Sequence, residues 1–227
     1  MQEERFQTIG KSQIRVDAFD KVTGRPCKIT YSREDSILES AKRHPFHTTI
    51  KIGADKSGKI LVYQSSQVEN CGAYNNQAPW MNIRAMVHSA GPYKIDNIRT
   101  DTYGVYTNNP TPCAFRGYSS PQVIFGNEMI MDELARELGI SIVELKRKNL
   151  LEKGSRTATG QTLIYETLLK DMMEDIIKDT DYCKKEQEYK NQTGIWKKGI
   201  SLVTSYRGAA LGGQGVESSC AMLSGMS

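Results

Sequence analysis

The chain has 227 residues, 38% of them apolar and 25% charged, and this balance excludes a collagen-like, low-complexity or wholly disordered chain. Its net charge of +4 is small and its basic residues lie among acidic ones, which argues against a nucleic-acid partner. No apolar run approaches the roughly 18 residues that span a bilayer, and Met1–Arg5 leads into no secretory signal, so we expect a soluble, cytoplasmic protein without a membrane partner.

The first part of the chain predicts mainly strands. A short strand is expected over 25–31. Ser32, with Asp35 three residues later, then predicts a capped helix that runs to about residue 43. The segment 47–74 predicts a β-hairpin, because two alternating runs flank a short turn that contains glycine.

The middle of the chain predicts a helix and then a strand. The helix is expected over 80–90, where Gly91-Pro92 provides a stop signal. Alternation over 97–107 predicts the strand, which prolines 110 and 112 would end.

The second half predicts mainly helices. Ser119-Ser120-Pro121 indicates a helix start with a hydroxyl cap, and Gly139 ends its apolar face. Ser141 and Glu144 form a capping box for a helix over 142–151. Two further helices and a last strand are expected at 168–177, 181–192 and 196–204. Strands early and helices late predict an α+β arrangement.

Outside one loop, few residues indicate chemistry. The five cysteines are far apart and odd in number, which argues against zinc or disulfides and favours reduced thiols, several of them buried. His44 and His47 leave open a metal-ligand pair or polar loop contacts, and we favour the second. Gly208–Gly215 leaves open a phosphate-binding loop or a mobile loop, and again we favour the second. Four methionines are assigned to the core, namely Met129, Met131, Met172 and Met173.

The most informative stretch is Pro112–Gln122. A glycine-containing loop places Arg116 and Tyr118 directly before a helix start, where backbone N–H groups and a positive helix end suit an anionic or oxo-metal ligand. The alternative is that Arg116 pairs with a surface acid and Tyr118 packs under the helix. Spacing alone favours this alternative.

Several motifs together resemble one family, the large, molybdopterin-binding subunit of xanthine dehydrogenases and aldehyde oxidases. The loop Ala114–Tyr118 with Pro121-Gln122 is similar to that family's AFRGFGGPQ segment. The resemblance runs continuously over about 25–205. Its other motifs are Ser32–Asp35 with Lys42–Phe46, Tyr93–Ile95 with Asn97-Ile98, Glu144–Leu150 and Thr157–Gln161.

The resemblance implies a mixed sheet with packed helices and a molybdenum hydroxylase that oxidises an electron-poor carbon, with a glutamate as general base. It implies a molybdenum–molybdopterin cofactor in the cytosine dinucleotide form, with iron–sulfur and FAD groups on other subunits or domains. The implied cofactor-binding residues are Ala114, Phe115, Arg116 and Gly117, with the Arg116 backbone against the molybdenum ligands. Tyr118 matches the aromatic that packs on the substrate ring. Arg84 matches an arginine of purine hydroxylases, which implies a purine-like substrate.

Departures from the family lead us to expect an internally deleted and C-terminally truncated chain. Its glycine-rich cofactor loop has no counterpart between Gly24 and Arg25, no residue matches the catalytic glutamate, and Ser201–Val203 replaces a second ring-packing aromatic. The expected parts are a remnant of the subunit's opening, a partial molybdopterin-binding domain and a glycine-rich truncated end, at 1–24, 25–206 and 207–227. We expect the isolated chain to be inactive; the alternative is a non-catalytic remnant or subunit-interaction fragment.

Overall fold

The computed structural model describes residues 29–206. The chain divides into two units, Met1–Ser40 and Ala41–Ser227, which are described separately. The predicted division into parts at 1–24, 25–206 and 207–227 stays a prediction, because the structure does not describe residues 1–28 and 207–227.

In the first unit, the described residues form one helix, α2 (Arg33–Glu39). The predicted capping box is present: the Ser32 hydroxyl accepts from the Asp35 N–H at 3.1 Å, and the Asp35 carboxylate accepts from the Ser32 N–H at 3.3 Å. The helix ends before residue 43. The strand predicted over 25–31 is absent from its described residues, 29–31.

The predicted hairpin is confirmed in the second unit, where β1 (Phe46–Ala54) and β2 (Ile60–Gly72) pair antiparallel. The turn between them is closed by Asp55, whose carboxylate accepts from the backbone N–H groups of Ser57 at 2.9 Å and Lys59 at 3.0 Å. The Ser57 hydroxyl also donates to this carboxylate, at 2.7 Å, and this bond, together with the backbone ones, lowers the pKa of the Asp55 carboxyl below its usual value. The turn is therefore set by residues that are neighbours in the sequence.

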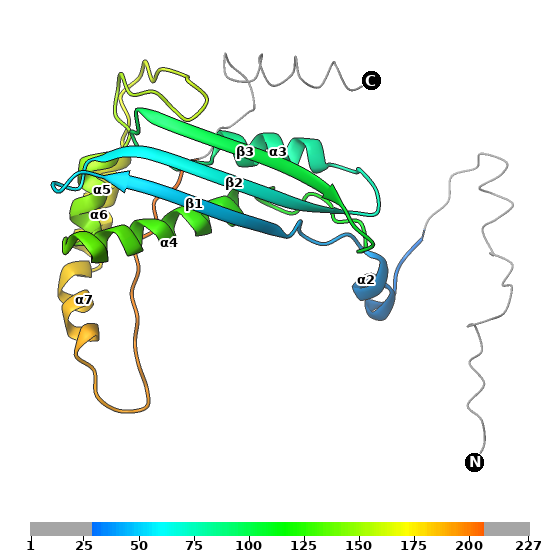
Figure 1. The fold of residues 1–227 in the computed structure, drawn as a ribbon. Helices are drawn as coiled ribbons and strands as arrows, with labels where there is room; N and C mark the ends of the chain where they lie inside the picture. The colour runs from blue at the N-terminus through cyan, green and yellow to red at the C-terminus, as the bar shows by residue number, and fades with distance from the viewer. Residues whose placement is uncertain (1–28, 207–227) are drawn as a thin grey trace, which may run out of the picture. The chain divides into compact units, whose positions relative to one another are not determined.

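The third strand makes the sheet mixed. β3 (Asn97–Tyr106) pairs parallel with β2, so the order is β1-β2-β3 (Figure 1). A parallel pair needs a crossover connection, and here it contains α3 (Ala78–Val87). The predicted fold class, α+β with a mixed sheet and packed helices, is confirmed.

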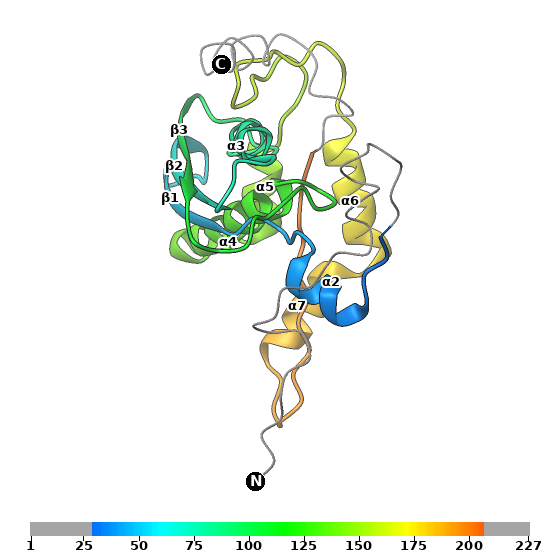
Figure 2. The ribbon, with the colours of Figure 1, turned by 90° about the vertical axis from the view of Figure 1, so that its right-hand side faces the viewer.

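Three helices pack on one face of the sheet. α3, α4 (Ser120–Leu138) and α5 (Ile142–Asn149) lie on the same side of the three strands in Figure 2. α4 approaches β1 closely, since a Cβ added at Gly126 would lie 3.2 Å from the Ile50 side chain. The predicted stop at Gly139 is confirmed by its left-handed φ of 66°.

The core lies between this sheet face and the helices. Tyr63 of β2 and Leu145 of α5 are among its fully buried members. The methionine prediction is half right. Met131 and Met173 are buried, whereas Met129 and Met172 are 45% and 58% exposed, because they lie on the outer sides of their helices.

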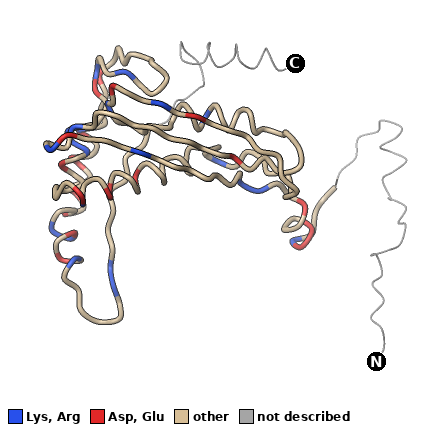
Figure 3. The backbone as a smooth tube through the Cα atoms, viewed as in Figure 1, with Lys and Arg blue, Asp and Glu red and all other residues tan. Residues whose placement is uncertain are grey.

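The remaining predicted helices are confirmed as α6 (Leu169–Asp179) and α7 (Tyr182–Lys190). Lys and Arg lie among Asp and Glu along both (Figure 3), so their outer surfaces carry both signs of charge. No helix among residues 29–206 is long and apolar enough to cross a membrane.

The strand predicted over 196–204 is wrong. The segment has no regular structure, because its polar groups bind buried side chains instead of a neighbouring strand. The Leu202 carbonyl accepts from the Lys146 ammonium group, and the Thr204 N–H donates to the Glu128 carboxylate at 3.1 Å. The buried ion pair of Lys146 and Glu128 therefore supplies the hydrogen bonds that a neighbouring strand would otherwise make.

Among the described cysteines, all free thiols, Cys71 is buried, Cys113 is partly buried and Cys183 is exposed. Burial raises the pKa of the Cys71 thiol, and the nearby Glu69 raises it further. Cys27, Cys220 and the Gly208–Gly215 stretch lie outside the described residues.

Candidate functional site

The loop between β3 and α4 ends in a tight left-handed turn. Gly117 and Tyr118 have φ values of 102° and 55°, and the Tyr118 N–H donates to the Phe115 carbonyl at 2.6 Å. A non-glycine residue in this region is disfavoured by contacts of its Cβ. The turn at Tyr118 therefore depends on contacts from elsewhere in the chain.

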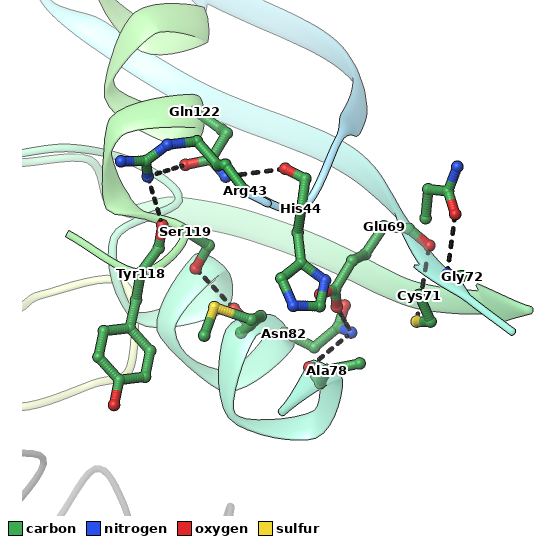
Figure 4. Close-up of polar contacts among 12 residues, drawn as sticks. Arg43, His44, Glu69, Cys71, Gly72, Ala78, Asn82, Tyr118, Ser119 and Gln122 are labelled. Atoms are coloured by element: carbon green, nitrogen blue, oxygen red, sulfur yellow. Dashed lines mark hydrogen bonds and ion pairs between the residues drawn. The ribbon is translucent and has the colours of Figure 1, made fainter. Parts of the chain in front are cut away.

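Arg43 supplies those contacts. Its guanidinium donates to the carbonyls of Arg116 and Tyr118, both at 2.9 Å, and lies 4.8 Å from the centroid of the Phe115 ring. A third hydrogen bond reaches the Gln122 side chain at 3.4 Å. Figure 4 shows Arg43 extended toward Tyr118 and Gln122, with the Tyr118 ring pointing away from it.

The segment that carries Arg43 runs beside the loop. The Cys113 N–H donates to the Lys42 carbonyl, and the Gln122 amide donates to the His44 carbonyl, both at 2.9 Å. Arg43 was not identified as a site residue from the sequence. The signal that could have found it is the Lys42–Phe46 motif, which resembles a family segment.

The predicted hydroxyl cap at the start of α4 is wrong. The Ser119 hydroxyl donates to the Met81 carbonyl on α3 at 2.6 Å, and it makes no capping bond to its own helix. Ser120 is buried as well. Because Ser119 is buried against α3, its hydroxyl ties the end of the loop to that helix.

The structure brings together two of the residues expected at the site. The Arg84 guanidinium, on α3, lies 5.8 Å from the centroid of the Tyr118 ring, which is within reach of a cation–π contact. No hydrogen bond, ion pair or ring contact among residues 29–206 joins the exposed side chain of Arg116 to either of them. The roles assigned to these residues stay predictions.

The donors of this site suit an anionic group. The backbone N–H groups of Ala114–Gly117 have no acceptor within the described part of the chain. The buried Nε of Arg84 also lacks a partner there. Unmet N–H donors next to a cation are the groups that hold phosphate and oxyanion oxygens, so these residues fit a cofactor with phosphate and oxo groups.

A buried acid–base pair lies next to the loop. The His44 Nδ1 pairs with the Glu69 carboxylate of β2, which also accepts from the Asn82 amide of α3 (Figure 4). Burial raises the pKa of the Glu69 carboxyl above its usual value, and His44 offsets part of this rise. His47, in contrast, is exposed on β1, so the two histidines do not converge. Residues 29–206 hold no cluster of three metal ligands.

The buried carboxyl predicts a pH dependence of stability. The unfolded chain loses the Glu69 proton near pH 4.5 and the native chain at a higher pH. Between the two pKa values the native state binds more protons, so the free energy of unfolding falls as pH rises, by about 1.4 kcal/mol for each unit between them. Urea titrations at several pH values measure this fall. Glu69→Gln should reduce it, and the Asp132 carboxyl, whose pKa burial also raises, accounts for a remaining part.

Glu133→Gln, which removes an exposed carboxylate, is the charge-matched control and should keep the wild-type fall. If Glu69→Gln and wild type show the same pH profile, another group causes the fall.

Comparisons with known proteins bear on this site. A family model described as a molybdopterin cofactor-binding domain matches residues 12–150. The chain is 40% identical over 141 residues to the nicotinate dehydrogenase large molybdopterin subunit of Eubacterium barkeri, which covers 62% of this chain and 33% of that one. It is 39% identical over 145 residues to a probable xanthine dehydrogenase subunit from Bacillus subtilis. That match covers 62% of this chain and 20% of the relative.

A solved structure supports the same relationship. The aldehyde oxidoreductase of Desulfovibrio desulfuricans superposes with a TM-score of 0.68 at 33% identity, over 76% of this chain and 19% of that one. The chain thus spans a third or less of the length of these relatives.

Proposed function

Because the chain belongs to the family of molybdopterin cofactor-binding domains of molybdenum hydroxylases, we propose that it supplies part of a site that oxidises a purine or related heterocycle. The observation that carries the proposal is the pairing of Arg84 with the Tyr118 ring beside a loop with unmet N–H donors. A ring that stacks and a guanidinium that stabilises negative charge are what a heterocycle requires as it is attacked.

In this proposal the loop binds the cofactor through its backbone. The N–H groups of Ala114, Phe115, Arg116 and Gly117 donate to oxygen atoms of the cofactor, with the Arg116 backbone next to the metal ligands. The bound molybdenum cofactor supplies the oxidising chemistry. Its form is the cytosine dinucleotide, whose added phosphate needs further donors of the same kind.

The proposed partners are the subunits or domains that carry iron–sulfur and FAD groups and remove the electrons, in a cytoplasmic complex of purine metabolism. The chain by itself does not turn over substrate, because none of residues 29–206 matches the general base and the loop offers few of the contacts that a dinucleotide needs.

A second candidate function is subunit interaction without catalysis. It is favoured by the sheet face opposite the helices, where Val62, Tyr103 and Val105 are 48%, 54% and 45% exposed. Purified chain that holds no molybdenum and binds a hydrophobic dye would favour this candidate.

The test uses the full chain labelled with 15N, with molybdate as an oxyanion probe and xanthine as a heterocycle. Saturable shifts of the amide resonances of Ala114–Gly117 with molybdate, and of Arg84 and Tyr118 with xanthine, would support the proposal. Shifts confined to scattered lysines would contradict it. Xanthine-dependent dye reduction should be absent, and steady turnover that Arg116→Ala abolishes would overturn the proposed inactivity.

A further inference from the structure

We infer that Arg43 is a positioning residue of this site and that its guanidinium sets the direction of the peptide groups at 116–118. The inference rests on the proposed function only for the ligand of the loop, because the clamp itself consists of contacts within the chain. Two carbonyls, those of Arg116 and Tyr118, accept from different nitrogen atoms of one guanidinium, both at 2.9 Å.

The chemistry of the guanidinium suits this arrangement. Its planar fork holds two acceptors at fixed positions, which a lysine ammonium does not, and its face lies on the Phe115 ring at 4.8 Å. Hydrogen bonds from a charged donor are stronger than neutral ones. They offset the strain of the left-handed Tyr118, whose φ is 55°.

The clamp has a consequence for the donors of the loop. With the Arg116 and Tyr118 carbonyls bound to Arg43, the N–H groups of Ala114–Gly117 are left without an acceptor among the described residues. No carboxylate in residues 29–206 pairs with Arg43, so the positive charge of its guanidinium is not neutralised by an acidic side chain there. Arg43 therefore both occupies the acceptors and favours an anion at the donors.

The side chain is placed by its two neighbours. The Lys42 carbonyl accepts from the Cys113 N–H, and the His44 carbonyl accepts from the Gln122 amide. The His44 side chain is buried against Glu69. The backbone on each side of Arg43 is thus tied to the loop or to the sheet. Little of the conformational entropy of the segment remains to be lost when the guanidinium binds.

The clamp can be measured without cofactor. Arg43 binds the carbonyl oxygen of Arg116, and trypsin cuts the peptide bond between that carbonyl and Gly117. Limited trypsinolysis of the full chain, followed by mass spectrometry, gives the initial rate of cleavage after Arg116 relative to cleavage after exposed Lys197. In Arg43→Met this ratio should rise about tenfold or more, since losing one charge-assisted hydrogen bond changes the open population by about that factor.

Two further variants separate the clamp from general destabilisation. Arg43→Lys keeps the charge but not the fork, and its ratio should lie between those of wild type and Arg43→Met. Arg136→Met removes an exposed arginine whose side chain, among residues 29–206, bonds only to the Asp132 carbonyl within α4, and it should keep the wild-type ratio.

An unchanged ratio in Arg43→Met, or an equal rise at Arg116 and Lys197, would overturn the inference. The molybdate titration tests the link to the ligand, because the shifts at Ala114–Gly117 should weaken in Arg43→Met. If molybdate fails to shift these resonances in wild type while the trypsin ratio behaves as expected, the proposed function fails and the clamp stands.

Discussion

Lys146→Ala is expected to lower the free energy of unfolding by about 3–5 kcal/mol, the usual cost of removing one partner of a buried ion pair. The Lys146 side chain is 1% exposed and its ammonium group binds both the Glu128 carboxylate and the Leu202 carbonyl. Alanine would leave the buried Glu128 carboxylate without its positive partner and the Leu202 carbonyl without the Lys146 donor. Urea unfolding followed by circular dichroism measures the loss.

A surface pair provides the control. Lys190 pairs with Glu186 one turn away on α7 at 3.1 Å, and the Lys190 side chain is 65% exposed. Lys190→Ala should cost no more than about 0.5 kcal/mol, because water screens the pair. Equal losses in the two variants would show that the buried pair contributes no more than a surface pair.

Lys146→Ala should also release the last described segment, which ends at Tyr206. The Glu128 carboxylate also accepts from Thr204 and from the Tyr93 hydroxyl, the latter at 2.6 Å, and so fixes the chain that leads to Tyr206. The Tyr206 ring stacks on His88, with centroids 5.1 Å apart, and its hydroxyl donates to the carbonyl of the residue before that histidine. Burial raises the Tyr206 pKa to about 12. A lower pKa in Lys146→Ala, measured by ultraviolet titration of this tyrosine, would report the release.

Gly72→Ala is expected to have the second large effect, a loss of about 3 kcal/mol with displacement of the site loop. Gly72 ends β2 with a φ of 65°, and an added Cβ would lie 2.7 Å from the Pro110 carbonyl oxygen and 2.8 Å from Pro112 and Thr111. These neighbours are backbone and ring atoms, which cannot rotate away. The start of the loop that carries Arg116 must therefore shift.

Gly139→Ala is the matched control. Its φ of 66° is nearly the same, but nothing lies within 4 Å of the added Cβ. It should cost only the backbone strain, about 1–2 kcal/mol. The difference between the two variants isolates the crowding at Pro110–Pro112. If both variants lose the same stability, and the loop resonances stay in place in Gly72→Ala, the close approach of Gly72 to Pro110–Pro112 does not contribute to the loss of stability.

The site was accessible to sequence reasoning only in part. Spacing alone favours an ordinary surface arginine at Arg116, and only the family resemblance assigns both Arg84 and Tyr118 to one substrate site; their contact comes from the tertiary structure. The spacing of residues does not predict the role of Arg43, because its partners lie more than seventy residues later in the chain. Apart from the resemblance of the Lys42–Phe46 motif to a family segment, nothing local distinguishes a clamping arginine from a solvated one.

Features that depend on near neighbours follow from the sequence. The Ser32 cap closes over three residues, the Asp55 turn over four, and the left-handed stop at Gly139 needs one residue without a Cβ. The hairpin follows from alternation and its turn. Each of these contacts forms wherever the local sequence occurs, so its pattern can be read directly.

Features whose partners are distant depend on the tertiary structure. The Ser119 hydroxyl, a good helix cap by its position, binds Met81 on another helix because burial brings that carbonyl within 2.6 Å. The segment at 196–204 has the composition of a strand, yet its backbone binds Lys146 and Glu128. A polar group buried by the fold must take the partner that the fold supplies, and that partner cannot be identified from neighbouring residues.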